Sequence, residues 1–189
     1  MSNVVKYLDK CAASWDKKSR LDHAATLFGV DIADRLSTEN LRLFLVHAVG
    51  RAVNPGCVAD FALLLQGEQG LGKSHALEHL FGRENYHQVS LADPDLPIDT
   101  WCLEIDGPVD PELLKIQVST RNDRYREPYE RAISDHPRRC VFAVTTSDDH
   151  FVGEARRFLP VHVTSPTHPT GITFIRDQIW GEIRTVYGK

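Results

Sequence analysis

The most informative run of residues in this chain reads Phe61-Ala62-Leu63-Leu64-Leu65-Gln66-Gly67-Glu68-Gln69-Gly70-Leu71-Gly72-Lys73-Ser74. Its first five residues are continuously apolar, which is typical of a parallel strand buried on both faces. The next part matches the pattern G-x-x-x-x-G-K-[ST], in which a glycine-rich turn points backbone N–H groups at phosphate oxygens. Helix-favouring residues follow from Lys73. The run therefore predicts a strand, a phosphate-binding loop and a helix.

The loop indicates a nucleoside triphosphate, which we expect to be ATP with Mg²⁺. Lys73 is expected to reach the β- and γ-phosphates, and the Ser74 hydroxyl to ligate Mg²⁺. The other residues expected to bind the cofactor in the loop are Gly67, Glu68, Gln69, Gly70, Leu71 and Gly72. The alternative is an ordinary glycine-rich turn between a strand and a helix.

Two acids close a second apolar run, Trp101-Cys102-Leu103-Glu104-Ile105-Asp106. Residues two apart on a strand share a face, so Glu104 and Asp106 can point into one site. A phosphate loop needs such carboxylates to hold Mg²⁺ and to orient the attacking water. We therefore predict that Glu104 and Asp106 are metal-binding and catalytic. The alternative is a solvated strand end.

A third strand is predicted over Arg139–Thr146 and ends in polar residues. Thr146 and Ser147 are predicted to contact the γ-phosphate, although Thr145-Thr146-Ser147 also suits a plain strand-to-loop cap. Arg156 and Arg157 follow. An arginine from the same or a neighbouring subunit can stabilise the transferring phosphate, so both are predicted to be catalytic. Paired arginines are also common on solvated surfaces.

Residues 115–139 carry seven cations against four anions, a local excess of three, with two tyrosines among them. Arginine beside tyrosine suits contact with phosphate together with base stacking. The predicted nucleic-acid contacts are Arg121, Arg124, Tyr125, Arg126 and Arg131. A charged loop or a subunit interface would show the same pattern of residues.

The rest of the chain supplies helices, loops and one further strand. Residues 1–57 are predicted to be a helical region, with a strong helix beginning near Glu39 and capped by Ser37 or Thr38. Residues 83–100 and 120–139 are expected to be loop-rich or irregular. Asp110-Pro111 predicts the start of a helix that runs to about Ser119.

Residues 158–163 are predicted to be a fourth strand at a sheet edge, because Pro160 cannot donate a ladder hydrogen bond. A terminal amphipathic helix is predicted from Ile175, Ile179, Ile183 and Tyr187. Strands alternating with helices predict an α/β fold with a mainly parallel sheet over residues 58–189.

Composition narrows the class of protein. Net charge is −4 and charged residues make up 25%, so neither a generally basic nucleic-acid-coating protein nor bulk disorder is indicated. The four cysteines are scattered and form no zinc-spaced set. No apolar stretch is long enough to cross a bilayer, and the first residues lack a signal-peptide pattern. We expect a soluble protein of the bacterial host cytoplasm, with no membrane partner.

Taken in order, these motifs resemble the virulence-associated protein E family of P-loop ATPases from phages and mobile elements, which is related to the superfamily 3 helicases. The resemblance lies in Leu64–Ser74, Trp101–Ile105, Asp123–Tyr129, Arg139–Thr146 and Arg156–Val161. Ser147 stands where the family's sensor strand ends in asparagine. Asp106 stands close to the family's second acid, and Gly107-Pro108 follows it.

The resemblance implies a three-layer, AAA+-like P-loop ATPase that assembles as a ring, possibly of six subunits. It implies action on DNA during replication, single-stranded DNA being the expected form, with other replication proteins as partners. ATP would lie between subunits, so that Arg156 or Arg157 acts in trans. Two other functions stay open. One is a nucleotide-dependent interaction protein with weak or no hydrolysis, and the other is a P-loop kinase of small molecules.

Overall fold

The computed structural model describes residues 3–91, 97, 100–106, 110–125, 134–147 and 157–186. Its centre is a five-stranded parallel sheet with the order β2-β3-β6-β1-β7. The strands are β1 (Ala62–Gln66), β2 (Tyr86–Val89), β3 (Cys102–Asp106), β6 (Val141–Thr146) and β7 (Phe158–His162). The fold is therefore α/β with a mainly parallel sheet, as the alternating pattern predicts.

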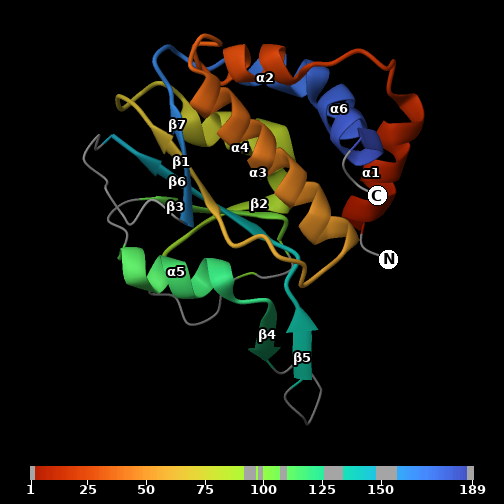
Figure 1. The fold of residues 1–189 in the computed structure, drawn as a ribbon, viewed down its shortest axis with the longest axis vertical. Helices are drawn as coiled ribbons and strands as arrows, with labels where there is room; N and C mark the ends of the chain where they lie inside the picture. The colour runs from red at the N-terminus through yellow and green to blue at the C-terminus, as the bar shows by residue number, and fades with distance from the viewer. Residues whose placement is uncertain are drawn as a thin grey trace.

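Helices cover both faces of this sheet (Figure 1). One face carries α1 (Asn3–Ser14), α2 (Leu21–Leu27), α3 (Arg35–Val53), α4 (Lys73–Phe81) and α6 (Pro169–Val186). The other face carries α5 (Pro111–Ser119). Side chains alternate between the two cores along β1, because Leu63 and Leu65 pack on the first side and Ala62 and Leu64 on the second.

The first core contains the larger aromatic residues. Trp101 and Trp180 lie with ring centroids 4.6 Å apart, and Phe81 contacts both rings. Each indole N–H is satisfied by a helix carbonyl, of Ala48 for Trp101 and of Leu80 for Trp180. Buried indoles that keep a hydrogen bond avoid the cost of an unpaired donor. These contacts fasten α3, α4 and α6 to the start of β3.

The N-terminal helices lie within residues 1–57, where helices are predicted, and they pack into the same apolar core as the sheet. The start of α3 differs from the prediction near Glu39. The helix begins at Arg35, and the N-cap is Asp34, whose carboxylate accepts from the Ser37 amide at 3.1 Å and from its hydroxyl at 2.6 Å. Ser37 is therefore not the cap itself. It is the residue whose amide donates to the capping carboxylate of Asp34, three residues earlier.

Two short elements lie where the sequence predicts loops. Strand β2 joins the sheet edge beside β3, and β4 (Asn122–Tyr125) pairs antiparallel with β5 (Ser134–Pro137) as a hairpin. The hairpin projects away from the sheet body below α5 (Figure 1). Each strand has four residues and lacks the apolar alternation that would predict it.

The remaining predictions for secondary structure are confirmed. β7 is the other edge strand, as Pro160 indicates. α5 starts with Pro111 behind the cap Asp110 and ends at Ser119. α6 buries Ile175, Ile179 and Ile183, whereas Tyr187 lies outside the described residues. None of the helices in the described ranges combines the length and apolar character needed to cross a membrane.

Candidate functional site

The glycine-rich loop leaves the carboxyl end of β1 and enters α4 through two left-handed glycines. Gly70 has φ +89° and Gly72 has φ +85°, a region that residues with a side chain rarely adopt. A Cβ on Gly72 would lie 2.5 Å from the Thr167 Oγ1, whereas one on Gly70 would meet no atom within 4 Å. Glycine is required at both positions by the backbone, and at Gly72 by packing as well.

Lys73 is the first residue of α4 and is largely buried. Its ammonium donates to the carbonyl oxygens of Gly67, at 2.7 Å, and Glu68, at 2.8 Å. The loop therefore curls around the lysine head group at the positive end of a helix dipole. A buried ammonium, a helix N-terminus and a glycine turn together form a site suited to an anion.

Beside the loop, Glu104 is the centre of a hydrogen-bonded cluster. Its side chain is fully buried, and its Oε1 accepts from the Ser74 hydroxyl at 2.6 Å and the Thr145 hydroxyl at 2.7 Å. The three residues come from α4, β3 and β6. They meet because the carboxyl ends of parallel strands share one edge of the sheet.

A hydroxyl and a carboxylate are hard oxygen ligands of the kind that Mg²⁺ takes together with phosphate oxygens and water. Ser74 and Glu104 therefore fit the magnesium of a nucleotide bound in the loop. In the part of the chain that the structure describes, no group of three or more His, Cys, Asp and Glu side chains gathers as a metal site. Asp106 ends β3, and its side chain lies outside the described residues.

Sequence reasoning did not single out Tyr86, the first residue of β2. Its hydroxyl donates to the second carboxylate oxygen of Glu104, Oε2. The residue lies in a segment expected to be loop, and the contact spans the sheet edge, so no local pattern signals it. Burial and the hydrogen bond to Glu104 raise the pKa of Tyr86, which keeps its hydroxyl protonated.

On β6 the structure adds a threonine to the predicted pair of Thr146 and Ser147. Thr145 is the residue that reaches Glu104. Thr146 contributes its backbone carbonyl, which accepts from the Gly67 amide at 3.2 Å, and Ser147 is exposed just beyond the strand. Alternation along a strand explains this, because Thr145 shares the α4-facing side with Val141 and Ala143. The contact of Thr146 and Ser147 with a γ-phosphate stays a prediction.

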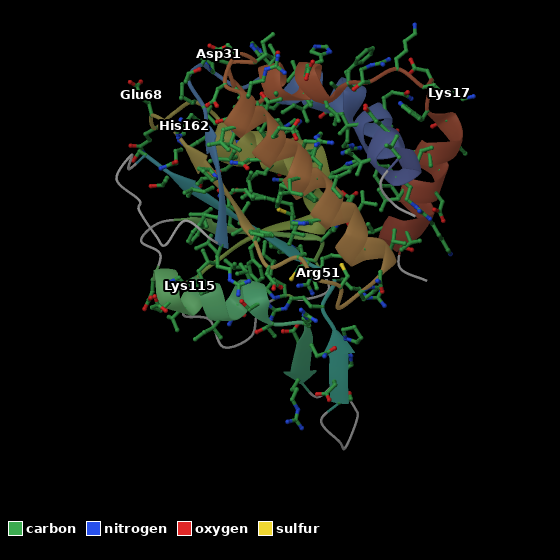
Figure 2. All side chains as sticks on the ribbon, in the orientation of Figure 1. Lys17, Asp31, Arg51, Glu68, Lys115 and His162 are labelled. Carbon is green, nitrogen blue, oxygen red and sulfur yellow. The ribbon has the colours of Figure 1, made fainter. Side chains whose placement is uncertain are left out.

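A cavity of about 540 Å³ lies against the loop. Figure 2 shows its lining residues Glu68 and His162 on the same side of the molecule. The rest of its wall is formed by Gln66, Gly67, Leu71, Val163 and Thr164. It is large enough for a small organic ligand and adjoins the site suited to anions. A smaller cavity of about 290 Å³ is lined by Asn85, Thr100, Trp101 and Arg139, near the start of β3.

The segment after β7 holds the loop in place through backbone hydrogen bonds. The Val163 amide donates to Gln66 O at 2.7 Å, and the Thr167 amide donates to Leu71 O at 2.8 Å. The Thr167 hydroxyl also donates to Gly72 O at 3.0 Å. The same segment bonds to the end of α2, since the Thr164 amide donates to Gly29 O at 2.9 Å. Residues 163–168 are called the strap below.

Arg157 lies at the amino ends of the strands, whereas the loop lies at their carboxyl ends. It precedes β7 and pairs with Asp60, just ahead of β1, with Nη1 3.1 Å from Oδ2. A five-residue strand such as β1 is about 16 Å long, which exceeds the reach of an arginine. This separation favours a role in trans over a role in cis for Arg157. A role in trans stays a prediction, and Arg156 lies outside the described residues.

Two of the predicted nucleic-acid residues, Arg121 and Arg124, lie at the β4–β5 hairpin. Arg121 is exposed ahead of β4, and Arg124 on β4 pairs with Asp135 at 3.0 Å on an exposed face. The buried Arg138 anchors the base of the hairpin, with its Nε donating to Asp123 Oδ2 at 2.8 Å and its Nη1 to Gln117 O. Tyr125 ends β4. Its side chain, Arg126 and Arg131 lie outside the described residues.

Comparisons with known proteins agree with this architecture. The model of the virulence-associated protein E-like domain family matches residues 8–189, and no curated protein matches the chain. Two solved structures of the NrS-1 C-terminal region are similar in fold. One, described as an apo A form of residues 305–718, has a TM-score of 0.61 at 13% identity, covering 90% of this chain and 46% of its own.

The other, also an apo A form, has a TM-score of 0.59 at 12% identity and covers 96% and 45% respectively. The chain thus spans less than half the length of these solved structures, and likeness at such low identity shows the fold alone. The match to the family extends over nearly the whole chain and includes the loop, the Glu104 strand and the hairpin. This protein therefore belongs to the virulence-associated protein E-like domain family.

Proposed function

We propose that this protein is a P-loop ATPase that binds ATP with Mg²⁺ and hydrolyses it to act, helicase-like, on DNA in phage or mobile-element replication. The observation that carries the proposal is the Ser74–Glu104 hydrogen bond of 2.6 Å beside the glycine-rich loop. It joins a phosphate-binding motif on one strand end to a buried carboxylate on another. A turn between a strand and a helix needs no such carboxylate for its stability.

Binding follows from the loop and the cavity beside it. The loop amides and Lys73 suit the phosphates, and the Lys73 contacts with Gly67 O and Glu68 O exchange for phosphate oxygens when the nucleotide enters. The cavity lined by Gln66, His162 and Thr164 is adjacent and takes the nucleoside. Affinity thus combines the charged loop with a cavity wall of mixed polar and apolar side chains.

Hydrolysis needs a water held in line with the γ-phosphate and charge placed to stabilise the transition state. Bound Mg²⁺ supplies part of that charge. Among this chain's own residues, Lys73 adds a cation, Ser74 and Glu104 hold the metal side of the site, and Glu104 or Asp106 orients the water. A neighbouring subunit contributes Arg157, because the sheet separates this residue from its own loop.

Action on DNA rests on the β4–β5 hairpin. It projects from the body (Figure 1), and its base is fixed by Arg138, so exposed cations such as Arg121 and Arg124 are presented on a rigid support. Arginine contacts with phosphate are independent of sequence and weaken with salt.

The test compares ATP binding and turnover with and without single-stranded DNA in the wild type, Lys73→Ala and Lys6→Ala. Lys6 is an exposed lysine on α1 and serves as the matched control. We expect the wild type and Lys6→Ala to bind ATP and to hydrolyse it faster with DNA, and Lys73→Ala to lose both. Solution mass under the same conditions reports assembly beyond the 21.3 kDa monomer.

Other outcomes would contradict parts of the proposal. A wild type that binds ATP and never hydrolyses it, even with DNA, would be a nucleotide-dependent interaction protein. Transfer of the γ-phosphate to a small acceptor in place of water would make it a kinase. A monomer under all conditions would remove Arg157 from the catalytic site, since that residue is proposed to act in trans.

A further inference from the structure

Tyr86 lies at the outermost strand of the sheet, yet its hydroxyl reaches the most buried acid of the site. In the parallel pair of β2 and β3, Tyr86 is opposite Cys102, and Glu104 is two residues further along. Such diagonal neighbours are separated by about 7–8 Å between backbones, a gap that a tyrosine side chain spans. The hydrogen bond from Tyr86 to Glu104 Oε2 is therefore set by strand register.

We propose that Tyr86 is a positioning residue that fixes the orientation of the Glu104 carboxylate toward the magnesium nucleotide. The inference rests on the proposed function, because it assigns a role within the same site. The edge strand β2 would then contribute to the site as well as to the sheet, because it carries a hydroxyl that acts through Glu104.

The argument begins with the acceptor positions of the carboxylate. An ionised carboxylate has about four lone-pair sites, two on each oxygen. Ser74 and Thr145 occupy those on Oε1, and Tyr86 occupies one on Oε2. Of the four sites, the described residues thus leave one on Oε2, which can accept from a metal-bound or attacking water.

Without the Tyr86 hydroxyl, the carboxylate would be held on one oxygen only. The last torsion of a glutamate side chain has a broad, two-fold profile and does not fix the plane by itself. The carboxylate could then pivot about Oε1, which Ser74 and Thr145 still hold, and the open site on Oε2 would lose its direction. Ser74 and Lys73 would be unaffected, so nucleotide phosphates would still bind the loop.

A purely structural role for Tyr86 is the competing explanation, since its ring packs against the apolar core. Tyr86→Phe keeps the ring and removes only the hydroxyl. Tyr7→Phe is a matched control, because the Tyr7 hydroxyl also donates to a carboxylate, Asp177 Oδ1 at 2.5 Å. That pair joins α1 to α6, and neither residue belongs to the site described above.

The experiment measures ATP affinity with and without Mg²⁺, the Mg²⁺ concentration for half-maximal turnover, and kcat and KM. For Tyr86→Phe we expect unchanged affinity without Mg²⁺, a weaker gain in affinity on adding Mg²⁺, and kcat lower by about ten- to a hundredfold. KM for MgATP should rise only as far as the Mg²⁺-dependent affinity falls, so the loss of kcat should exceed the change in KM. Tyr7→Phe should match the wild type in every one of these quantities, even if its melting temperature falls.

The outcomes separate this inference from the function beneath it. Tyr86→Phe with wild-type kcat and wild-type Mg²⁺ dependence overturns the positioning role and leaves the ATPase intact. Equal losses of kcat in Tyr86→Phe and Tyr7→Phe also overturn it, because they would reflect stability alone. A wild type that binds no nucleotide overturns the proposed function, and the inference falls with it.

Discussion

Alanine at Gly72 and at Gly70 should have unequal costs, although both glycines have nearly the same φ. A left-handed alanine costs about 1–2 kcal/mol at either position. At Gly70 nothing more is added, since the new Cβ meets no atom within 4 Å. At Gly72 the Cβ would lie 2.5 Å from the Thr167 Oγ1. Thr167 must then move, which breaks its 3.0 Å hydrogen bond to Gly72 O, worth about 1 kcal/mol.

Gly72→Ala should therefore be less stable than Gly70→Ala by about 1–2 kcal/mol, or roughly 2–8 °C in melting temperature. Thermal and denaturant unfolding of both variants measure the difference. Gly72→Ala with Thr167→Ala relieves the contact, so the pair should be non-additive by about 1 kcal/mol. Equal melting temperatures for the two single variants, or strict additivity of the double variant, would refute the steric reasoning.

Three further predictions concern other contacts of the fold and the site. Thr145→Val removes a buried hydroxyl from Glu104 Oε1 and should lower the free energy of unfolding by about 1.5–3 kcal/mol; the exposed Thr26→Val should stay within about 0.5 kcal/mol. Arg138→Ala leaves the Asp123 carboxylate without its buried partner and should cost about 3–5 kcal/mol in chemical denaturation, against about 0–1 kcal/mol for the exposed Arg124→Ala. The Ser37 hydroxyl and amide lower the pKa of the Asp34 carboxyl below its ordinary value of 3.8, so this cap stabilises the fold above that pH and loses its effect as the pH falls through the lower value. Asp34→Ala should thus cost about 1 kcal/mol at neutral pH, and the difference from the wild type should shrink in acid; a cost that is the same at all pH values would contradict the assignment.

Local signals predict the middle of this sheet well. The strand before the loop is a continuous apolar run, the strand that carries Glu104 begins as one, and the glycine pattern between Gly67 and Ser74 predicts the turn into α4. The same holds for the start of α5, where an aspartate followed by a proline specifies both the cap and the first helical residue. In each case, the residues that determine the element are neighbours in sequence.

The misses have a common physical cause. β2 and the β4–β5 hairpin consist of four-residue strands whose stability comes from pairing, so their sequences carry little pattern. The contact of Tyr86 with Glu104 joins residues 18 positions apart, and that of Thr167 with Gly72 joins residues 95 apart. Strand register and the way in which distant segments pack together determine such contacts, and neither can be inferred from a local sequence pattern. The contact of Thr145 with Glu104, which the sequence does not single out, likewise depends on which side of β6 faces α4.

The strap has a consequence for how events at the loop can be observed. Its amides of Thr164 and Ser165 donate to Gly29 O, that of His168 donates to Leu27 O, and that of Thr167 donates to Leu71 O. One short stretch thus forms hydrogen bonds with both the loop and the end of α2, so a change in either should affect its amides. The hydrogen-exchange rates of these amides, nearly a hundred residues downstream of the loop, should therefore change when a nucleotide binds. Slower exchange would mean that binding stabilises this end of the sheet, and faster exchange would mean that it destabilises it.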